Sequence, residues 1–303
     1  MTRPAAVCLI VNDRAGDHSG PASRSEMLRD LLDRTGLEAE IFRPRPGQSL
    51  TALAHEALDQ GCGTLVAAGG DGTICAVAEA CHDRDATLGV IPQGTFNYFA
   101  RGLGIPLDPE AAVAALAGGT TAELRLGEVN GAVFLNNASL GLYPAILERR
   151  ETTYRRWGRS RAAAYWSVAQ TLVGMRRAMR LRIDLDGQTL TLRTPLAFVA
   201  NSAYQLRQFN LGGIDALETG AFPLFTAPAA SRAEIARATL GLALRAAQEG
   251  QDFELHRASR IVIDPGRPRV LVARDGERQM MQAPLTIRRR DRPLRVLVPG
   301  AAA

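Results

Sequence analysis

The first 124 residues alternate short apolar runs with segments in which apolar residues recur at helical spacing. Short apolar runs between turn signals are typical of buried strands, and apolar positions three and four apart are typical of amphipathic helices. The pattern predicts strands at residues 6–11, 38–42, 64–68 and 87–91, and helices at residues 25–35, 50–60 and 72–81. Strands that alternate with helices indicate an α/β domain with a mostly parallel sheet, over residues 1–124.

The pattern changes near Arg125, after which strand-like runs are separated by turn signals. We expect strands at residues 132–136, 181–185, 189–193, 196–200, 260–263 and 269–273. Asp186-Gly187 separates two of these runs, and Asp-Gly between alternating runs is a strong signal for a β-hairpin. Two helical stretches, at residues 161–180 and 231–248, interrupt the strands. The sequence therefore predicts a mainly antiparallel second domain over residues 125–287.

Composition narrows the class of protein. The chain has 303 residues, of which 46% are hydrophobic and 22% charged, so it can bury two cores and is not globally disordered. No apolar stretch approaches the roughly 18 residues of a membrane-spanning helix. The N-terminus does not show the pattern of a signal peptide, and we expect a cytoplasmic protein. The spacing of Cys8, Cys62, Cys75 and Cys81 matches neither a zinc site nor a disulfide framework, so we expect four buried thiols.

All 36 basic residues are arginine. The absence of lysine excludes the P-loop lysine, the strand lysine of protein kinases and every mechanism through a lysine Schiff base. The net charge of +5 indicates an anionic partner, such as phosphate, nucleic acid or acidic lipid.

Two glycine-containing motifs follow predicted strands of the first domain. GGDGT stands at residues 69–73, directly before a predicted helix, and PQGTFN stands at residues 92–97. Glycines let the backbone approach an anion closely, and N–H groups at a helix start point toward it. Ligands of parallel sheets bind beyond the carboxyl ends of the strands, so two such loops indicate one nucleotide site. Taken alone, GGDGT is also typical of an ordinary strand-to-helix turn in which Asp71 is the N-cap.

In this order and spacing, the motifs resemble those of the bacterial diacylglycerol kinase-like lipid kinases. That group also includes eukaryotic diacylglycerol, sphingosine and ceramide kinases, and it is distantly related to NAD kinases and phosphofructokinases. The resemblance extends to NDRAG at residues 12–16, to residues 134–141 and 199–204, and to Asp-Gly-Glu at residues 275–277. It implies a first domain that binds ATP and a β-sandwich second domain. It also implies that a strand from about residue 288 to residue 303 returns to the first domain.

The resemblance also implies roles for individual residues. The nucleotide would be bound by Asn12, Gly16, Gly69, Gly70, Asp71, Gly72, Thr73, Gly94, Thr95 and Asn97. Asp71 would position Mg²⁺, because an aspartate among phosphate-binding glycines repels phosphate unless a cation bridges the two. Glu277 would be the general base on the acceptor hydroxyl, with Asp275 beside it. Without the resemblance, residues 275–277 are more typical of a polar hairpin turn.

Three positions depart from the family pattern. Tyr98 stands in place of an aspartate after GTFN, and Arg125 stands where the family commonly carries an aspartate. Thr219-Gly220 replaces an Asp-Gly pair whose aspartate helps bind a structural cation in the family. Each change removes a negative charge from the expected metal network, which weakens the prediction of a structural cation.

Residues 149–182 contain ten arginines, a single acid, Glu151, and both tryptophans, Trp157 and Trp166. Basic residues with amphipathic aromatics are typical of a surface that lies on anionic lipid. A solvated helix covering the sandwich explains the composition equally well. Nucleic acid is the least favoured partner.

The sequence thus favours an ATP- and Mg²⁺-dependent lipid kinase that phosphorylates a hydroxyl of a diacylglycerol-like lipid at the inner face of the membrane. A kinase for a soluble acceptor such as NAD is a second hypothesis, which Asp-Gly-Glu and the arginine-rich segment disfavour. A catalytically silent nucleotide- or lipid-binding regulator is a third, which the lost acids favour and the retained Asp71 and Glu277 disfavour. The acceptor lipid and the oligomeric state, including a homodimer, stay open.

Overall fold

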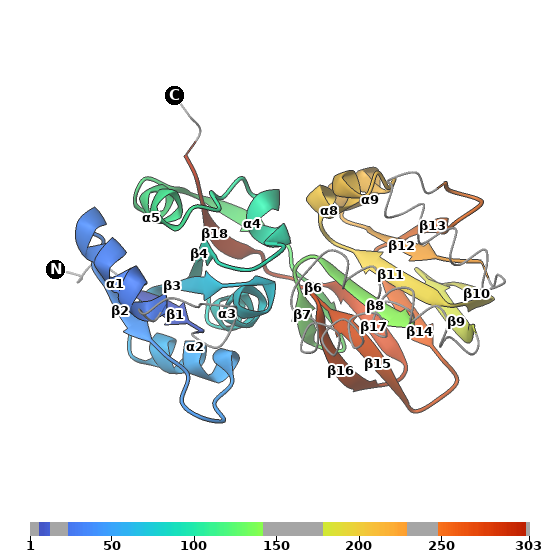
Figure 1. Ribbon diagram of the computed structural model, residues 1–303. Coiled ribbons are helices and arrows are strands. Elements are labelled where there is room, and N and C mark those ends of the chain that lie inside the picture. Colours follow the sequence, from blue (N-terminus) through green and yellow to red (C-terminus); the bar gives the residue numbers. More distant parts are fainter. Residues whose placement is uncertain (1–5, 13–23, 142–177, 229–247, 301–303) are drawn as a thin grey trace, which may run out of the picture. The chain divides into compact units, whose positions relative to one another are not determined.

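A computed structural model describes residues 6–12, 24–141, 178–228 and 248–300 of the chain. The chain folds into two compact units, one of residues 1–126 with 290–303 and one of residues 127–289 (Figure 1). Most of the two helices predicted in the second half, and most of the arginine-rich segment, lie outside the described residues.

The first unit is built on a six-stranded sheet with the order β2-β1-β3-β4-β18-β5. Its strands are β1 Ala6–Val11, β2 Ala39–Phe42, β3 Cys62–Gly69, β4 Thr87–Pro92, β5 Thr120–Leu124 and β18 Leu294–Val298. Strands β1 to β4 pair in parallel. The last strand, β18, pairs in parallel with β4 and antiparallel with β5, and it is the dark red strand beside β4 in Figure 1.

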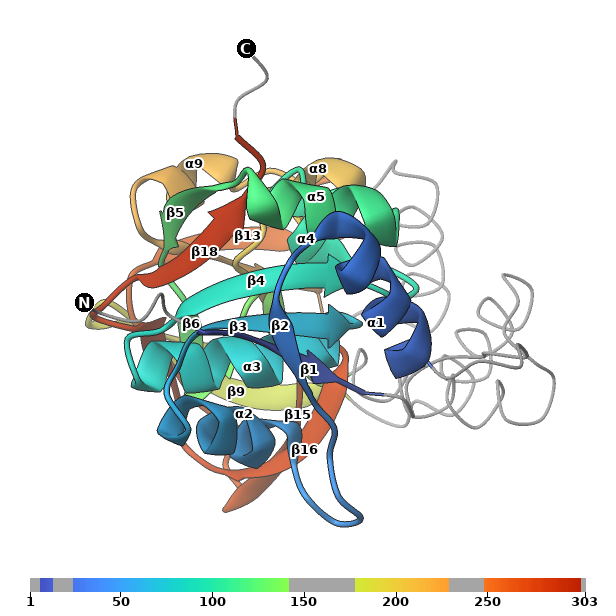
Figure 2. The same cartoon turned by 90° about the vertical axis from the view of Figure 1, so that its left-hand side faces the viewer.

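Helices cover both faces of this sheet (Figure 2). They are α1 Arg24–Thr35, α2 Leu50–Asp59, α3 Asp71–Asp83, α4 Tyr98–Gly102 and α5 Pro109–Ala117. On one face, Leu9 and Val66 of the sheet form a core with Leu28 of α1 and Val113 of α5. On the other face, α2 and α3 pack against each other and against β3. Burial on both faces explains why the strands show as nearly continuous apolar runs in the sequence.

The second unit contains two six-stranded sheets, with the orders β10-β9-β14-β17-β6-β7 and β13-β12-β11-β8-β15-β16. Their strands are β6 Gly127–Val129, β7 Ala132–Phe134, β8 Asn137–Gly141, β9 Met179–Leu185, β10 Gln188–Thr194, β11 Leu196–Ala200, β12 Phe222–Thr226, β13 Glu254–Ala258, β14 Ile261–Asp264, β15 Arg269–Arg274, β16 Glu277–Gln282 and β17 Leu285–Arg289. Within the described residues, all pairings in these two sheets are antiparallel. One apolar core takes side chains from both sheets, and Phe134 and Phe222 are its largest fully buried members.

Two short helices, α8 Ala203–Gln208 and α9 Ile214–Glu218, also belong to the second unit. They cover a smaller apolar cluster in which Leu206 of α8 packs with Phe225 and Phe253. The predicted hairpin is present, since Leu185 pairs with Gln188 across Asp186-Gly187. The predicted fold class, a mostly parallel α/β domain and an antiparallel β-sandwich, is confirmed. No helix in the described parts of the chain is long and apolar enough to cross a membrane.

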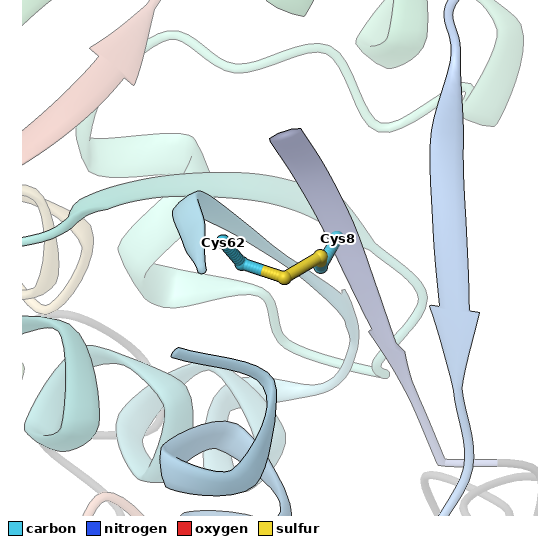
Figure 3. The surroundings of a disulfide bond; sticks show 2 residues. All are labelled: Cys8 and Cys62. Atoms are coloured by element: carbon cyan, nitrogen blue, oxygen red, sulfur yellow. A yellow bond between two sulfur atoms is a disulfide. The ribbon is translucent and has the colours of Figure 1, made fainter. Parts of the chain in front are cut away.

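Two sequence predictions need correction. The strand expected at residues 132–136 ends at Phe134, as β7, and β8 begins only at Asn137, because the chain leaves the sheet at Leu135 and Asn136. The expectation of four thiols is wrong for Cys8 and Cys62, which form a disulfide bond (Figure 3).

The disulfide depends on how the strands pair, which the spacing of cysteines along the chain does not reveal. Cys8 and Cys62 are 54 residues apart in sequence, but β1 and β3 are neighbours, and the two Cα atoms lie 6.1 Å apart. Both side chains are buried. Cys75 and Cys81, on α3, remain thiols.

Candidate functional site

The carboxyl ends of β1, β3 and β4 lie along one edge of the parallel sheet. From β1 the chain continues to β2 on one side, whereas from β3 it continues to β4 on the other, so the strand order reverses between β1 and β3. Ligands of open α/β sheets bind outside the strand ends at such a switch point. Val11 pairs with Ala68 and Gly69 pairs with Pro92, so Asn12 and the loops after β3 and β4 begin at this edge.

The glycine loops, residues 69–73 and 93–97, touch through Gly70 and Gly94. A Cβ atom added at Gly94 would lie 2.7 Å from the Cα of Gly70, and one added at Gly70 would lie 3.2 Å from the Cα of Gly94. The first distance is shorter than Cβ contacts in folded proteins, and its partner is backbone, which cannot rotate away. Glycine on both sides therefore leaves bare backbone at this point, as close binding of a phosphate group requires.

Asn97 fixes the shape of the second loop. Its backbone is left-handed, with φ of 50°, and its side chain is buried, with 5% exposed. Oδ1 accepts a hydrogen bond from the N–H of Gly94 at 2.8 Å, and Nδ2 donates to the carbonyl of Gly94 at 2.9 Å. The N–H of Gln93 donates to the carbonyl of Gly69 at 2.8 Å. Asn97 thus fixes the second loop around Gly94, and the bond from Gln93 to Gly69 joins this loop to the first. Thr95 is exposed.

Asp71 links the two loops. It is the first residue of α3, whose N-cap is Gly70, so the alternative in which Asp71 caps its own helix is wrong. Its Oδ1 accepts a hydrogen bond from the N–H of Phe99 at 3.2 Å, in the first turn of α4. The side chain of Asp71, in the first glycine loop, is therefore bonded to α4, the helix that follows the second glycine loop.

Asp71 could bind Mg²⁺ only if a bound ligand supplied further oxygen atoms to the ion. Among the described residues, no group of three or more His, Cys, Asp or Glu side chains could hold a metal ion. Mg²⁺ is commonly bound by one or two carboxylates together with substrate phosphates and water. An ion at Asp71 would take phosphate and water oxygens for the rest of its shell.

Gln93, in the second glycine loop, is a candidate site residue that the sequence motifs do not predict. Both amide atoms of Gln93 are buried and have no hydrogen-bond partner among the described residues. Buried amide groups in proteins are nearly always hydrogen-bonded. The orphaned side-chain amide of Gln93 therefore indicates that a bound ligand supplies its hydrogen-bond partners. Because a glutamine in a loop carries no periodic pattern, only the three-dimensional burial reveals it.

In the second unit, Asp275 and Gly276 form the two-residue turn between β15 and β16, where Arg274 pairs with Glu277. Their φ angles of 46° and 89° are typical of a type I′ hairpin turn, in which Asp-Gly is favoured. The interpretation of residues 275–277 as a hairpin turn therefore holds, and it does not conflict with a role in chemistry.

The carboxylate of Asp275 is directed at the backbone of its own unit. It accepts hydrogen bonds from the N–H groups of Leu135 at 2.6 Å, Asn136 at 2.7 Å and Asn137 at 3.2 Å. These bonds explain the break between β7 and β8, because the first two N–H groups bind a side chain instead of a neighbouring strand. Asp275 thus holds the hairpin turn against the β7–β8 connection. Glu277, the first residue of β16, is exposed.

The predicted site residues are divided between the two units. Asn12 and the glycine loops belong to the first unit, and residues 275–277 belong to the second. Gly16 lies outside the described residues. Tyr98, which stands in place of a family aspartate, stacks on Phe96 with ring centroids 5.4 Å apart and an interplanar angle of 5°.

The chain has the fold of solved structures titled as diacylglycerol kinases. One from Bacillus anthracis str. Sterne, provisionally titled so, superposes with a TM-score of 0.74 over 100% of both chains at 20% sequence identity. A second structure from that organism, titled a diacylglycerol kinase, gives a TM-score of 0.66 at 20% identity over 100% of both chains.

Sequence comparison supports the same likeness. Residues 6–129 match the model of the diacylglycerol kinase catalytic domain, which confirms the resemblance seen in the motifs. A Pseudomonas aeruginosa PAO1 protein named "Probable lipid kinase YegS-like" is 53% identical over 91 residues, which is 29% of this chain and 30% of that protein. A "Diacylglycerol kinase" of Staphylococcus haemolyticus is 29% identical over 207 residues, 67% of this chain and 62% of that protein. The chain thus matches about 30% of the length of the first of these relatives.

Proposed function

We propose that the protein is an ATP-dependent lipid kinase, which transfers the γ-phosphate of ATP to a hydroxyl of a diacylglycerol-like lipid. The observation that carries the proposal is the contact of Gly70 with Gly94 at the carboxyl edge of the sheet, where β3 and β4 end beside the switch point. The catalytic-domain match and the names of the two relatives support a phosphotransferase with a lipid acceptor.

The nucleotide's phosphates bind at the start of α3 in this proposal. The first N–H groups of a helix have no carbonyl partner within it, and the helix dipole favours an anion there. Gly70 and Gly94 allow close approach, and the orphaned amide of Gln93 offers one donor and one acceptor. Asn12, Gly16 and Thr95 complete the proposed contacts from the loops around them.

Asp71 holds the divalent ion in this proposal, directly or through water. When bound, Mg²⁺ neutralises charge on the phosphate oxygens during transfer. Because Asp71 also accepts the N–H of Phe99, its carboxylate is already oriented before the nucleotide arrives.

Glu277 is the proposed general base, which takes the proton of the acceptor hydroxyl. It is the exposed carboxylate of the hairpin, whereas Asp275 accepts three backbone hydrogen bonds and acts as a positioning residue. Access to the lipid would come through peripheral contact of residues 149–182 with anionic membrane, a part of the proposal that rests on composition alone.

The test is transfer of labelled γ-phosphate from ATP, with Mg²⁺, into mixed micelles. The acceptors are diacylglycerol, monoacylglycerol, phosphatidylglycerol, ceramide and a sphingoid base, each in a separate reaction, with NAD as the soluble acceptor. We expect label in an organic-extractable product with at least one lipid. Label in NAD alone would contradict the lipid acceptor. If no acceptor is labelled although ATP still binds, the result would contradict the proposed kinase activity and favour a catalytically silent nucleotide- or lipid-binding regulator.

A further inference from the structure

The second unit contains an arginine whose guanidinium binds three different acceptors. Arg289, the last residue of β17, donates from Nε to the carbonyl of Gly220 at 2.8 Å and from Nη2 to the carbonyl of Ala221 at 3.2 Å. Its Nη1 donates to Oδ1 of Asn201 at 3.0 Å. The guanidinium carbon lies 4.7 Å from the ring centroid of Phe222, which is fully buried. Carbonyl oxygens and a buried aromatic face together form a site built for a cation.

The two carbonyls belong to the turn that ends α9. The N–H of Gly220 donates to the carbonyl of Leu217, and the N–H of Ala221 donates to that of Ala216, which is the Schellman pattern with Gly220 in the left-handed conformation. Carbonyls at a helix end carry partial negative charge, which attracts a cation. Arg289 supplies this positive charge from a strand 68 residues further along the chain.

The family resemblance implies a structural cation at this turn, but the residues present do not fit a metal ion. Thr219 replaces the expected aspartate, and its Oγ1 is directed back at the helix, at 3.2 Å from the carbonyl of Asp215 and 3.0 Å from that of Ala216. The carboxylate of Asp215 binds Arg257 at 2.9 Å, which lowers the pKa of Asp215. In the described residues no cluster of three metal-ligating side chains exists.

We propose that Arg289 is the resident cation of the second unit, so that the turn after α9 is held by the protein's own guanidinium and needs no metal ion. A divalent ion at this turn would have to displace the Nε and Nη2 groups from the carbonyls of Gly220 and Ala221. It would also lie beside a positive charge, which repels it.

The same arginine is connected to the hairpin that carries Glu277. Asn201, which accepts from Arg289, donates from its N–H to the carbonyl of Asn136 at 2.7 Å and from Nδ2 to the carbonyl of Leu135 at 3.0 Å. The N–H groups of those two residues are two of the three that donate to Asp275. Arg289 therefore acts as a positioning residue, which stabilises the β7–β8 connection from one side while Asp275 stabilises it from the other.

The test is thermal unfolding of the full chain with EDTA, with Mg²⁺ and with Ca²⁺, read alongside hydrogen exchange of the peptide that spans residues 134–141. The variants are Arg289→Met and, as the matched control, Arg269→Met, which removes an exposed arginine from β15. For the wild type we expect the same Tm in all three conditions. For Arg289→Met we expect a Tm lower by about 5 °C or more, because a loss of about 2 kcal/mol in the free energy of unfolding shifts the Tm by several degrees in a unit of this size. We also expect faster hydrogen exchange in the peptide of residues 134–141. The control should change neither readout.

Two results would overturn the proposal. The first is a wild-type Tm that falls with EDTA and returns with Mg²⁺ or Ca²⁺, which would show a metal ion in the structural role. The second is an Arg289→Met variant whose Tm and peptide exchange match those of Arg269→Met. If Arg289→Met does not fold, Arg289→Lys takes its place. A single ammonium cannot bridge the same three acceptors in the guanidinium's fork geometry, so its peptide should still exchange faster than in the wild type. Because neither readout uses turnover, the result is independent of the proposed kinase activity.

Discussion

A methyl group on Gly94 would lie 2.7 Å from the Cα of Gly70, although the two residues stand in different loops after different strands. The side chain of Asn97 shapes the second loop, because it binds both the N–H and the carbonyl of Gly94, and the N–H of Gln93 joins this loop to the carbonyl of Gly69. The motifs GGDGT and PQGTFN, which are separate in the sequence, thus form one structural feature, in which Gly70 and Gly94 are in contact at the edge of the sheet.

Gly94→Ala should weaken ATP binding by about tenfold or more, because the added carbon forces the loops apart and 1.4 kcal/mol of lost binding already gives tenfold. Gly118→Ala is the matched control, since a Cβ there would meet nothing closer than the carbonyl of Ala114 at 3.9 Å. Titration calorimetry with ATP and Mg²⁺ measures both. Equal affinity in the two variants would show that the glycine contact does not form the nucleotide site.

Asp275→Ala should lower the free energy of unfolding of the second unit by about 2–4 kcal/mol, because three N–H groups lose a charged acceptor. Asp264→Ala removes a carboxylate with one local hydrogen bond, to the N–H of Gly266, and should cost less than about 1 kcal/mol. Urea unfolding compares the two. Equal losses would mean that Asp275 has no special structural role.

Reduction of the Cys8–Cys62 disulfide should destabilise the first unit by up to about 4 kcal/mol, the chain-entropy value for a loop of 54 residues. A reductant should therefore lower the urea midpoint of the wild type. It should leave the midpoint of a Cys8→Ala/Cys62→Ala variant unchanged. Alkylation of the unfolded, unreduced chain should label two cysteines, Cys75 and Cys81. Labelling of four would contradict the disulfide.

Cys81 should make stability depend on pH above about 9. Burial raises the pKa of its thiol from 9.0 to about 12. In the unfolded chain the thiol ionises from about pH 9, whereas in the folded chain it stays neutral, so its contribution is complete below pH 9 and is lost as the pH rises toward 12. The chain has no lysine to obscure this range. Between about pH 8 and about pH 10.5 the wild type should lose roughly 2 kcal/mol more than Cys81→Ala in urea unfolding. Parallel losses would show that the thiol ionises normally.

The sequence predicts β1 to β4 and α1 to α3 of the first unit, because the strands show as apolar runs and the helices have apolar residues at helical spacing. It does not predict α4, α5 or β5. It also predicts both glycine loops and the Asp-Gly turn of the last hairpin, which are local motifs. The sequence does not reveal the break between β7 and β8, because its cause, Asp275, lies about 140 residues further along the chain. Arg289 and the Cys8–Cys62 bond are missed for the same reason: long-range pairing leaves no local pattern.

The central claim is tested most directly by the turnover of Glu277→Gln with the preferred lipid from the labelled-phosphate assay. Glu277 is exposed at the start of β16, so the variant should fold normally and bind ATP as the wild type does. Loss of a general base typically lowers turnover by about 10²–10⁴-fold. Glu254→Gln, an exposed glutamate on β13 of the same sheet, should keep wild-type turnover. Turnover of Glu277→Gln equal to that of the wild type would contradict the assignment of Glu277 as the general base of this kinase.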